Sequence, residues 1–166
     1  NAGALPVPIT PVSQQTIGPT LGQASLDASV QAALIGFLLI SLFMVLYYRL
    51  PGALAVVALT VYAFVNLALY KLFGVTITLS GIAGFVLSLG IAVDANVLIF
   101  ERLKEELRAG RDLPSAIKEA ASRAWPSIRD GNATTLIATM ILFTMGTSFI
   151  KGFALTLTVG ILVSIF

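Results

Sequence analysis

The sequence predicts an all-α protein, a polytopic bundle of helices that cross a membrane. Of the 166 residues, 57% are hydrophobic and only 11% are charged, and the mean hydropathy is +0.96. This composition is typical of a membrane protein rather than of a soluble domain. Apolar runs of about 20 residues, the length that crosses a bilayer, recur along the chain between short polar or Gly/Pro-containing breaks.

The first 27 residues are polar and contain four prolines and three glycines. Because proline ends helices and is confined to the edges of sheets, we expect segment 1–27 to be a linker that precedes a bundle at 28–166. Two interpretations of this linker stay open. One is a flexible tether. The other, which the resemblance described below implies, is the return of the chain from a domain outside the membrane.

Four full apolar spans and one partial span follow the linker. The break at Arg49–Gly52 contains Pro51 and predicts a tight turn between the first two spans. The chain begins with Asn and stops at Phe166 inside an apolar run, so we expect it to be a piece of a longer protein. The expected spans are at about 29–48, 52–71, 79–101, 132–149 and 152–166.

The third span contains one carboxylate, Asp94. An ionised Asp at the centre of a membrane helix costs about 2.5–3.5 kcal/mol. Protonating a carboxyl whose ordinary pKa is about 3.9 costs about 4 kcal/mol at pH 7. Because these costs are similar, small changes in the surroundings can move Asp94 between its two states, and we predict that it binds a proton. The alternative is a side chain that reaches towards the headgroups near Glu101, for which Asp is short.

A stripe of small residues on the third span predicts close packing against another helix. Asp94 lies about 120° around the helix from this stripe, and Asn96 points in another direction. We therefore expect the third span to be the central helix of the bundle. The stripe consists of Gly81, Gly84, Ser88, Ala92 and Ala95.

Polar side chains at the start of the fourth span are candidates to support Asp94. Asn132 and Thr135 lie at about its depth and could reach it directly or through water. Thr134 of the same turn and Asn96 of the third span are further candidates for polar support. The alternative is a contact between helices, worth about 0.6 kcal/mol. The chain has no Cys and no His, and no nucleophile–base pair is recognisable. We therefore expect no metal site, no cofactor and no enzymatic activity.

Segment 101–130 collects most of the charged residues. Gly110 ends one helix, and Asp112 with Pro114 begins another. We expect two short amphipathic helices that lie at the membrane surface, with Trp125 at the interface. An ordinary solvated loop is the alternative for the first half of this segment.

The Lys and Arg residues predict the orientation of the chain. Eight of them lie at Arg49 and in segment 101–130, whereas Lys71 and Lys151 lie on the other side. Because cytoplasmic loops carry the excess of positive charge, segment 101–130 is expected in the cytoplasm. The N-terminal segment is then periplasmic or extracellular.

The motif at residues 92–102, which includes Asp94, Asn96, Glu101 and Arg102, resembles the fourth transmembrane helix of the SecD family. Members of this family are membrane subunits that, with SecF, assist the bacterial Sec protein-export channel. Other segments resemble further parts of the family in the same order along the chain. Residues 2–6 and 17–22 resemble the entry to its second transmembrane helix, and residues 131–138 and 150–156 resemble its fifth and sixth helices.

This resemblance implies a subunit of the resistance–nodulation–division superfamily in the bacterial inner membrane, where the proton-motive force drives protein export. Asp94 matches the carboxylate of the family motif. The implied partners are a SecF-like subunit or fused half, a SecYEG-type channel, an unfolded polypeptide and membrane lipids, with no nucleic acid. The first transmembrane helix and the bulk of the periplasmic domain are expected outside this sequence. Two alternatives stay open, a related exporter of lipids or small molecules and a passive membrane scaffold.

Overall fold

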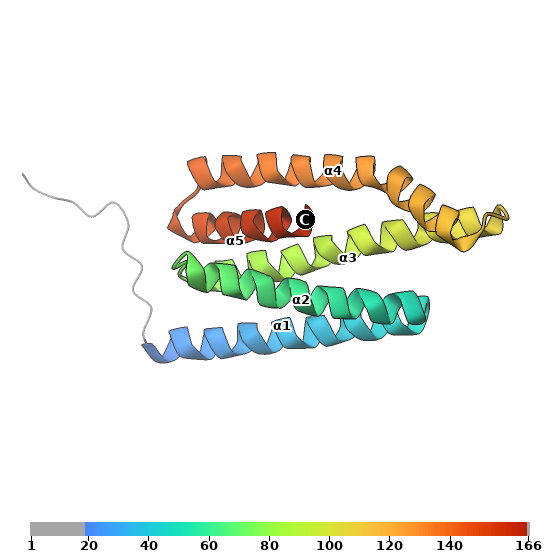
Figure 1. Ribbon diagram of the computed structural model, residues 1–166. Helices are drawn as coiled ribbons and strands as arrows, with labels where there is room; N and C mark the ends of the chain where they lie inside the picture. The colour runs from blue at the N-terminus through green and yellow to red at the C-terminus, as the bar shows by residue number, and fades with distance from the viewer. Residues whose placement is uncertain (1–18, 166) are drawn as a thin grey trace, which may run out of the picture.

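A computed structural model describes residues 19–165, and every regular element in this part of the chain is a helix. Residues 1–18, most of the expected linker, lie outside the described residues. The helices are α1 (Pro19–Tyr48), α2 (Leu50–Leu72), α3 (Leu79–Arg108), α4 (Leu113–Met145) and α5 (Ser148–Ile165) (Figure 1).

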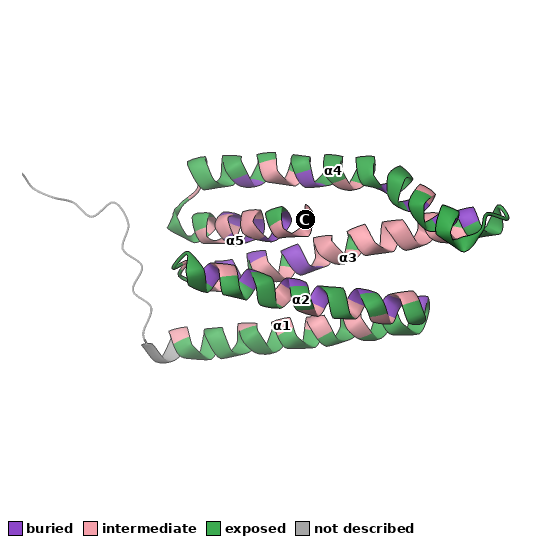
Figure 2. Ribbon diagram, viewed as in Figure 1, coloured by how far each residue is buried: buried purple, intermediate pink, exposed green. Residues whose placement is uncertain are grey.

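The helices form a bundle in which α3 is central, because it contacts each of the other four helices. The hairpin of α1 and α2 lies on one side of α3, and α5 lies between α3 and α4 (Figure 1). Buried residues concentrate on the faces that these helices turn towards one another, whereas the outer faces of α1 and α4 are largely exposed (Figure 2). This arrangement confirms the all-helical bundle and the central position predicted for the third span.

The first helix begins at Pro19, earlier than the expected start near residue 29. Residues 19–27 therefore form its first turns and are not an extended linker. Proline is tolerated in the first turn of a helix, and one turn further on Gln23 donates a hydrogen bond to Asp27 at 3.2 Å. A polar stretch with proline at its start can thus continue an apolar helix beyond the hydrophobic run.

A tight turn joins α1 to α2, as the sequence predicts. Its single non-helical residue, Arg49, has a φ of 54°, and Pro51 occupies the first turn of α2. A Cβ at Gly52 would collide with the carbonyl oxygen of Met44. Glycine at position 52 therefore allows the two backbones to approach.

The first part of the small stripe on α3 faces α5. A Cβ at Gly84 would collide with Thr156 and with the carbonyl oxygen of Phe153, and Ser88 fills the space left by Gly160. Gly81 also faces Thr156. The same end of this contact is tied to α2, because the Tyr70 hydroxyl donates to the Thr156 carbonyl at 3.0 Å.

The rest of the stripe lies further along α3. Ala92 packs with Leu59, Tyr62 and Leu89 in a cluster to which Val163 of α5 also belongs, and Ala95 lines the cavity that contains Asp94.

Segment 101–130 does not form the two separate short helices that were expected. Its first part is the end of α3, which continues to Arg108, and its second part is the beginning of α4, which continues through the expected start of the fourth span. Gly110, with a φ of 86°, makes the turn, and Asp112 caps α4 by accepting a hydrogen bond from the Ser115 amide at 3.3 Å. Pro126 lies inside α4 without ending it, and the helix bends in this region (Figure 1).

The break between α4 and α5 lies at Gly146 and Thr147, not between residues 149 and 152 as expected. A Cβ at Gly146 would collide with the Leu142 carbonyl oxygen and with the Ile150 side chain, so the break has room only for glycine at this position. Helix α5 begins at Ser148 and reaches the length of a span.

Within the described residues, four helices are long and apolar enough to cross a membrane: α1, α2, α3 and α5. Helix α4, expected as a full span, is not among them. Its apolar part begins only after the polar stretch from Arg129 to Thr135. The C-terminal half of α4 nevertheless lies beside α5 within the bundle (Figure 1).

Candidate functional site

A cavity of about 220 Å³ between α3 and α4 contains Asp94. Each helix lines it with residues at the spacing i, i+3, i+4, i+7, which places side chains on one helical face. On α3 these residues are Ile91, Asp94, Ala95 and Leu98. On α4 they are Ile128, Gly131, Asn132 and Thr135, and Ser127 completes the lining.

The cavity is open on the side of Asp94, whose side chain is exposed in this chain. Other residues on the same side of α3 are exposed as well, including Ala83 and Leu87. Gly90 lies one turn before Asp94, and a Cβ at this position would meet no atom within 4 Å. Asp94 thus supplies the carboxyl group on a face of α3 that otherwise consists of apolar and small residues.

Asn132 is the most buried polar residue of the cavity, with only 3% of its surface exposed. Its Nδ2 atom is buried and has no hydrogen-bond partner in the described part of the chain. A buried donor without a partner costs about 1–3 kcal/mol. The amide group therefore lacks the partner that its burial requires, and the side chain to which it belongs lines the cavity that contains Asp94.

Two of the residues predicted to support Asp94 do not line the cavity. Thr134 is exposed, and its hydroxyl donates to the Asp130 carbonyl at 2.8 Å. Asn96 is half-buried elsewhere on α3. The structure thus brings together Asp94, Asn132 and Thr135 and leaves Asn96 and Thr134 outside the site.

Ser127 and Gly131 are site residues that the sequence did not single out for this role. A Cβ at Gly131 would meet no atom within 4 Å, so the empty space beside this glycine is part of the cavity. The matching i, i+3, i+4, i+7 patterns on residues 91–98 and 128–135 are the signal that could have identified Gly131, whereas Ser127 lies outside them.

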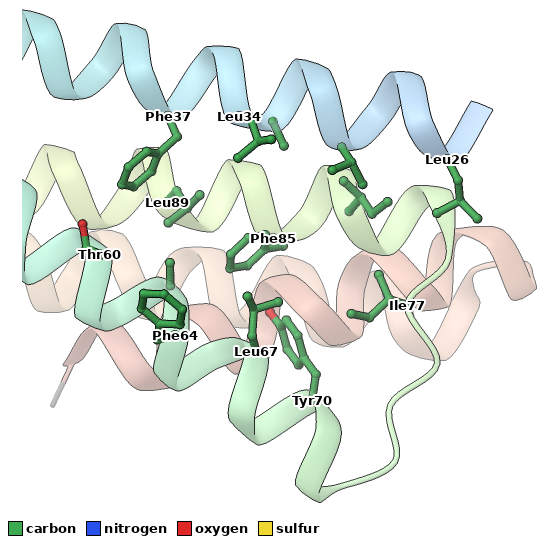
Figure 3. Close-up of a pocket in the computed structure, with 14 residues that line it drawn as sticks. Leu26, Leu34, Phe37, Thr60, Phe64, Leu67, Tyr70, Ile77, Phe85 and Leu89 are labelled. Atoms are coloured by element: carbon green, nitrogen blue, oxygen red, sulfur yellow. The ribbon is translucent and has the colours of Figure 1, made fainter. Parts of the chain in front are cut away.

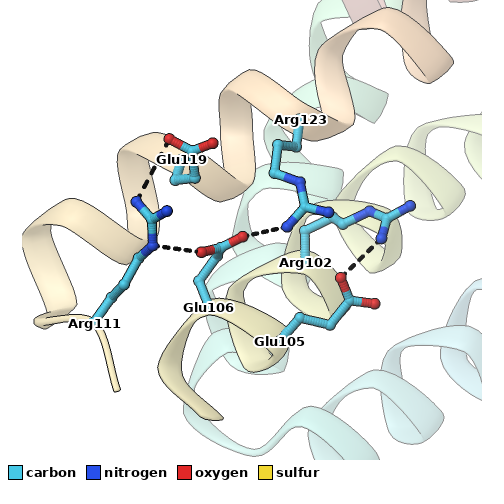
Figure 4. A network of polar contacts seen from close by, with 6 residues as sticks. All are labelled: Arg102, Glu105, Glu106, Arg111, Glu119 and Arg123. Carbon is cyan, nitrogen blue, oxygen red and sulfur yellow. Dashed lines mark hydrogen bonds and ion pairs between the residues drawn. The ribbon is translucent and has the colours of Figure 1, made fainter. Parts of the chain in front are cut away.

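Beyond the cavity, a buried carboxylate ties the ends of α3 and α4 together (Figure 4). Glu106 is only 4% exposed and pairs with Arg123 of α4 and, at 2.8 Å, with Arg111 of the connecting turn. The hydrogen bond to Glu106 raises the pKa of the Arg123 guanidinium above its ordinary value. Arg111 also lies 3.7 Å from Glu119. This network holds the two helices that line the cavity in a fixed register.

A second cluster joins the α1–α2 turn to α3. Tyr48 and Lys104 both donate hydrogen bonds to Glu101, each at 2.9 Å. The Lys104 ammonium also lies over the rings of Tyr47 and Tyr48, at 4.7 and 4.4 Å from their centroids, a favourable contact for a cation. The charged end of α3 is therefore attached to the bundle as well as to α4.

A larger cavity, of about 550 Å³, separates the first half of α1 from α2 and α3 (Figure 3). Its lining is apolar, with side chains such as Leu34, Phe64 and Phe85, and the Thr60 hydroxyl at its edge donates to the Val56 carbonyl. The opposite end of α1 is closely packed through Met44 and Tyr48. The described lining of this groove contains no carboxylate and no basic side chain, whereas the smaller cavity contains a carboxylate.

The family described as "Protein export membrane protein SecD/SecF, C-terminal" matches residues 6–166 of the chain. Among curated relatives, the chain is 56% identical over 170 residues to the protein translocase subunit SecD of Thermobaculum terrenum and 53% identical over 166 residues to that of Synechocystis. Each match covers all of this chain but only 33% and 35% of the relative. The chain thus spans about a third of the length of these relatives.

Solved structures match in the same way. The crystal structure of SecDF, a translocon-associated membrane protein from Thermus thermophilus, is 45% identical and gives a TM-score of 0.86 over 90% of this chain and 21% of that chain. A structure of SecDF in a super-membrane-facing form is 44% identical and gives a TM-score of 0.81, again over 90% of this chain and 20% of that chain.

Proposed function

Because the chain belongs to the SecD/SecF family of protein-export membrane proteins, we propose that it is the membrane core of a subunit that uses a proton gradient to assist protein export. Asp94 is the proton-binding residue of this core. Asn132 and Thr135 support it from α4, and the segment from Glu101 to Asp130 connects the site to the cytoplasmic side. The relatives are translocase subunits, so the role of the whole protein is transport.

The observation that carries this proposal is the cavity around Asp94. It provides a single carboxyl, set in a membrane-spanning helix, with polar side chains from α4 and space for several water molecules. A cavity of about 10–15 Å³ already accommodates one water, and this cavity has about 220 Å³. A proton can therefore reach and leave the carboxyl through water.

The exposure of Asp94 supports a second membrane unit as a partner. Ionisable residues in membrane spans face protein or water and not lipid, yet Asp94 lies on an exposed side of α3. We expect a SecF-like half to cover this side. The Sec channel, the exported polypeptide and the surrounding lipids are further expected partners of the whole protein.

The test uses the full-length subunit and its partner in inner-membrane vesicles with an imposed proton gradient. Asp94→Asn keeps the shape of the side chain but cannot ionise, so gradient-stimulated export is expected to fall to the level without a gradient. Asp94→Glu retains the acid and should keep part of the activity. Asp130→Asn is the matched control, because Asp130 is exposed and lies outside the cavity. Wild-type stimulation in Asp94→Asn would contradict the proposal.

Both alternatives predict that Asp94→Asn exports protein normally. They are separated by measuring the transport of lipids or small molecules in the same vesicles, which a proton-coupled exporter of these compounds would lose in Asp94→Asn and a passive scaffold would not show.

The proposed orientation places the hairpin of α3 and α4 in the cytoplasm of a bacterial cell and the start of α1 on the outer side of the inner membrane. The distribution of Lys and Arg supports this orientation. The loop between α2 and α3, at residues 73–78, is then on the outer side as well.

A further inference from the structure

We propose that the cavity at Asp94 provides separate hydrogen-bond partners for the two states of the carboxyl, with Asn132 serving the ionised form and Thr135 serving the protonated form. This inference rests on the proposed function, because it assumes that Asp94 gains and loses a proton. It goes further by assigning opposite roles to two side chains on the same face of α4.

Asn132 supplies a donor. Its Nδ2 group is buried and unpaired, and the side chain lines the cavity that contains Asp94. A hydrogen-bond donor stabilises a carboxylate more than a neutral acid. Whether it acts directly or through one water, Asn132 therefore favours the ionised form of Asp94.

Thr135 supplies an acceptor. Its hydroxyl has one hydrogen, which it donates to the carbonyl oxygen of Gly131 at 3.0 Å. Only the lone pairs of the Thr135 oxygen remain available to the cavity. A lone pair can accept the O–H of a protonated carboxyl but offers nothing to a carboxylate, so Thr135 favours the neutral form.

The rest of the described lining carries no charge. Helices α1, α2 and α5 contribute no side chain to it, and Asp94 is its one ionisable member. Arg129 and Asp130, between the lining residues Ile128 and Gly131 on α4, are exposed and pair with each other at 2.9 Å. The hydroxyl of Ser127 can both donate and accept.

The experiment measures the protonation of Asp94 by infrared spectroscopy of the full-length subunit with its partner half in proteoliposomes. The band of the protonated carboxyl is assigned by its loss in Asp94→Asn and is followed across pH. Asn132→Ala is expected to move the titration midpoint to higher pH by about one unit, a tenfold change in proton affinity. Thr135→Val is expected to move it to lower pH by about half a unit.

Controls separate these roles from a general loss of structure. Thr134→Val removes a hydroxyl that is bonded in the same way one residue away, but outside the cavity, and should leave the midpoint unchanged. Thr135→Ser keeps the hydroxyl, so its titration midpoint should equal that of the wild type. If Asn132→Ala does not assemble, Asn132→Leu removes the donor, keeps a side chain of similar size and adds no charge, and it should also move the midpoint to higher pH.

Opposite shifts for positions 132 and 135 would support the inference. Shifts in the same direction, or none, in a protein whose Asp94 still titrates would overturn it and leave the proposed function intact. If the wild-type carboxyl does not titrate at all while export still responds to the gradient, both the proposed function and this inference are wrong.

Discussion

At the scale of single residues, Gly131 is a position at which a substitution is expected to stabilise the protein but to impair the site. A helix gains about 0.5–1 kcal/mol when an interior glycine is replaced by alanine, and a Cβ here meets no atom within 4 Å. We expect Gly131→Ala to raise the melting temperature in detergent. The added methyl group takes space beside Asp94, so gradient-driven export in vesicles should fall. Unchanged export would show that water does not use this part of the cavity.

Gly84 is the opposite case, because the neighbouring helix occupies the space beside it. A Cβ at this position collides with backbone and side-chain atoms of α5, and overpacking of this kind typically costs about 1–3 kcal/mol. We expect Gly84→Ala to lower the free energy of unfolding in detergent by this amount. Gly36→Ala is the matched control, since a Cβ there meets no atom within 4 Å. Equal stability of the two variants would mean that α3 and α5 do not approach so closely.

The sequence was informative about single residues where one side chain is unusual in its surroundings. Asp94 stands out in an apolar span, and Asn132 and Thr135 stand out at the start of another. The burial of Glu106 could not be read in the same way, because it is one of several acidic residues in a charged segment. The sequence signal nearest to Glu106 is a row of three alanines on α4, spaced by four residues and completely buried: Ala116, Ala120 and Ala124.

At the scale of elements, the hairpin of α3 and α4 shows why the ends of helices were harder to predict than the turns. Gly110, Asp112 and Pro114 marked the turn, and the structure has it there. The change from apolar to charged residues suggested that the spans end at the membrane surface. Backbone hydrogen bonding does not depend on hydropathy, so α3 and α4 continue as helices through this change. Pro126 bends α4 without ending it, since one proline removes only one backbone donor.

The charge network at the end of this hairpin gives a prediction for the element as a whole. Glu106→Gln leaves two guanidinium groups without their shared carboxylate and is expected to lower the free energy of unfolding by about 1–3 kcal/mol. Glu105→Gln is the neighbouring control. The pair of Glu105 with Arg102 is exposed, and such pairs contribute about 0–1 kcal/mol. Denaturation of the full-length protein in detergent measures both, and equal effects would contradict the role of Glu106.

At the scale of the whole molecule, composition and span length predicted the helical bundle, and the small stripe predicted its central helix. The number of spans was less secure. The hydrophobic part of α4 is short, and α5 reaches the length of a span because the break before it lies at Gly146 and Thr147, earlier than expected. Such a break depends on the contact between a glycine and a carbonyl of the preceding turn, which hydropathy does not report.

The orientation of the molecule can be tested because the chain has no cysteine. Ser122 lies on the charged hairpin and Thr76 in the loop between α2 and α3, and both are exposed. In intact spheroplasts, an impermeant thiol reagent is expected to label Thr76→Cys and not Ser122→Cys. Labelling of both after the membrane is opened is the control. The reverse pattern in intact cells would invert the proposed topology.

The uncovered side of α3 leads to the last prediction, which concerns assembly. Leu87 is 48% exposed on the same side of the helix as Asp94, and a Cβ at Gly90, between them, would meet no atom within 4 Å in the described part of the chain. No contact within the described chain requires a glycine at position 90, and an ionisable side chain such as Asp94 does not face lipid. Together these features indicate that another helix approaches this side of α3 closely. Leu87→Cys should therefore crosslink to cysteines placed along a central helix of the SecF-like half.

Val61→Cys provides the comparison, because Val61 is 57% exposed on α2 and is expected to face lipid. Gly90→Leu should prevent this crosslink and the co-purification of the two halves, while the helical content of the subunit stays unchanged. If Val61→Cys crosslinks and Leu87→Cys does not, the partner covers a different side. Asp94 would then have to be reached by water from an open face, and proton transfer would not require the second half.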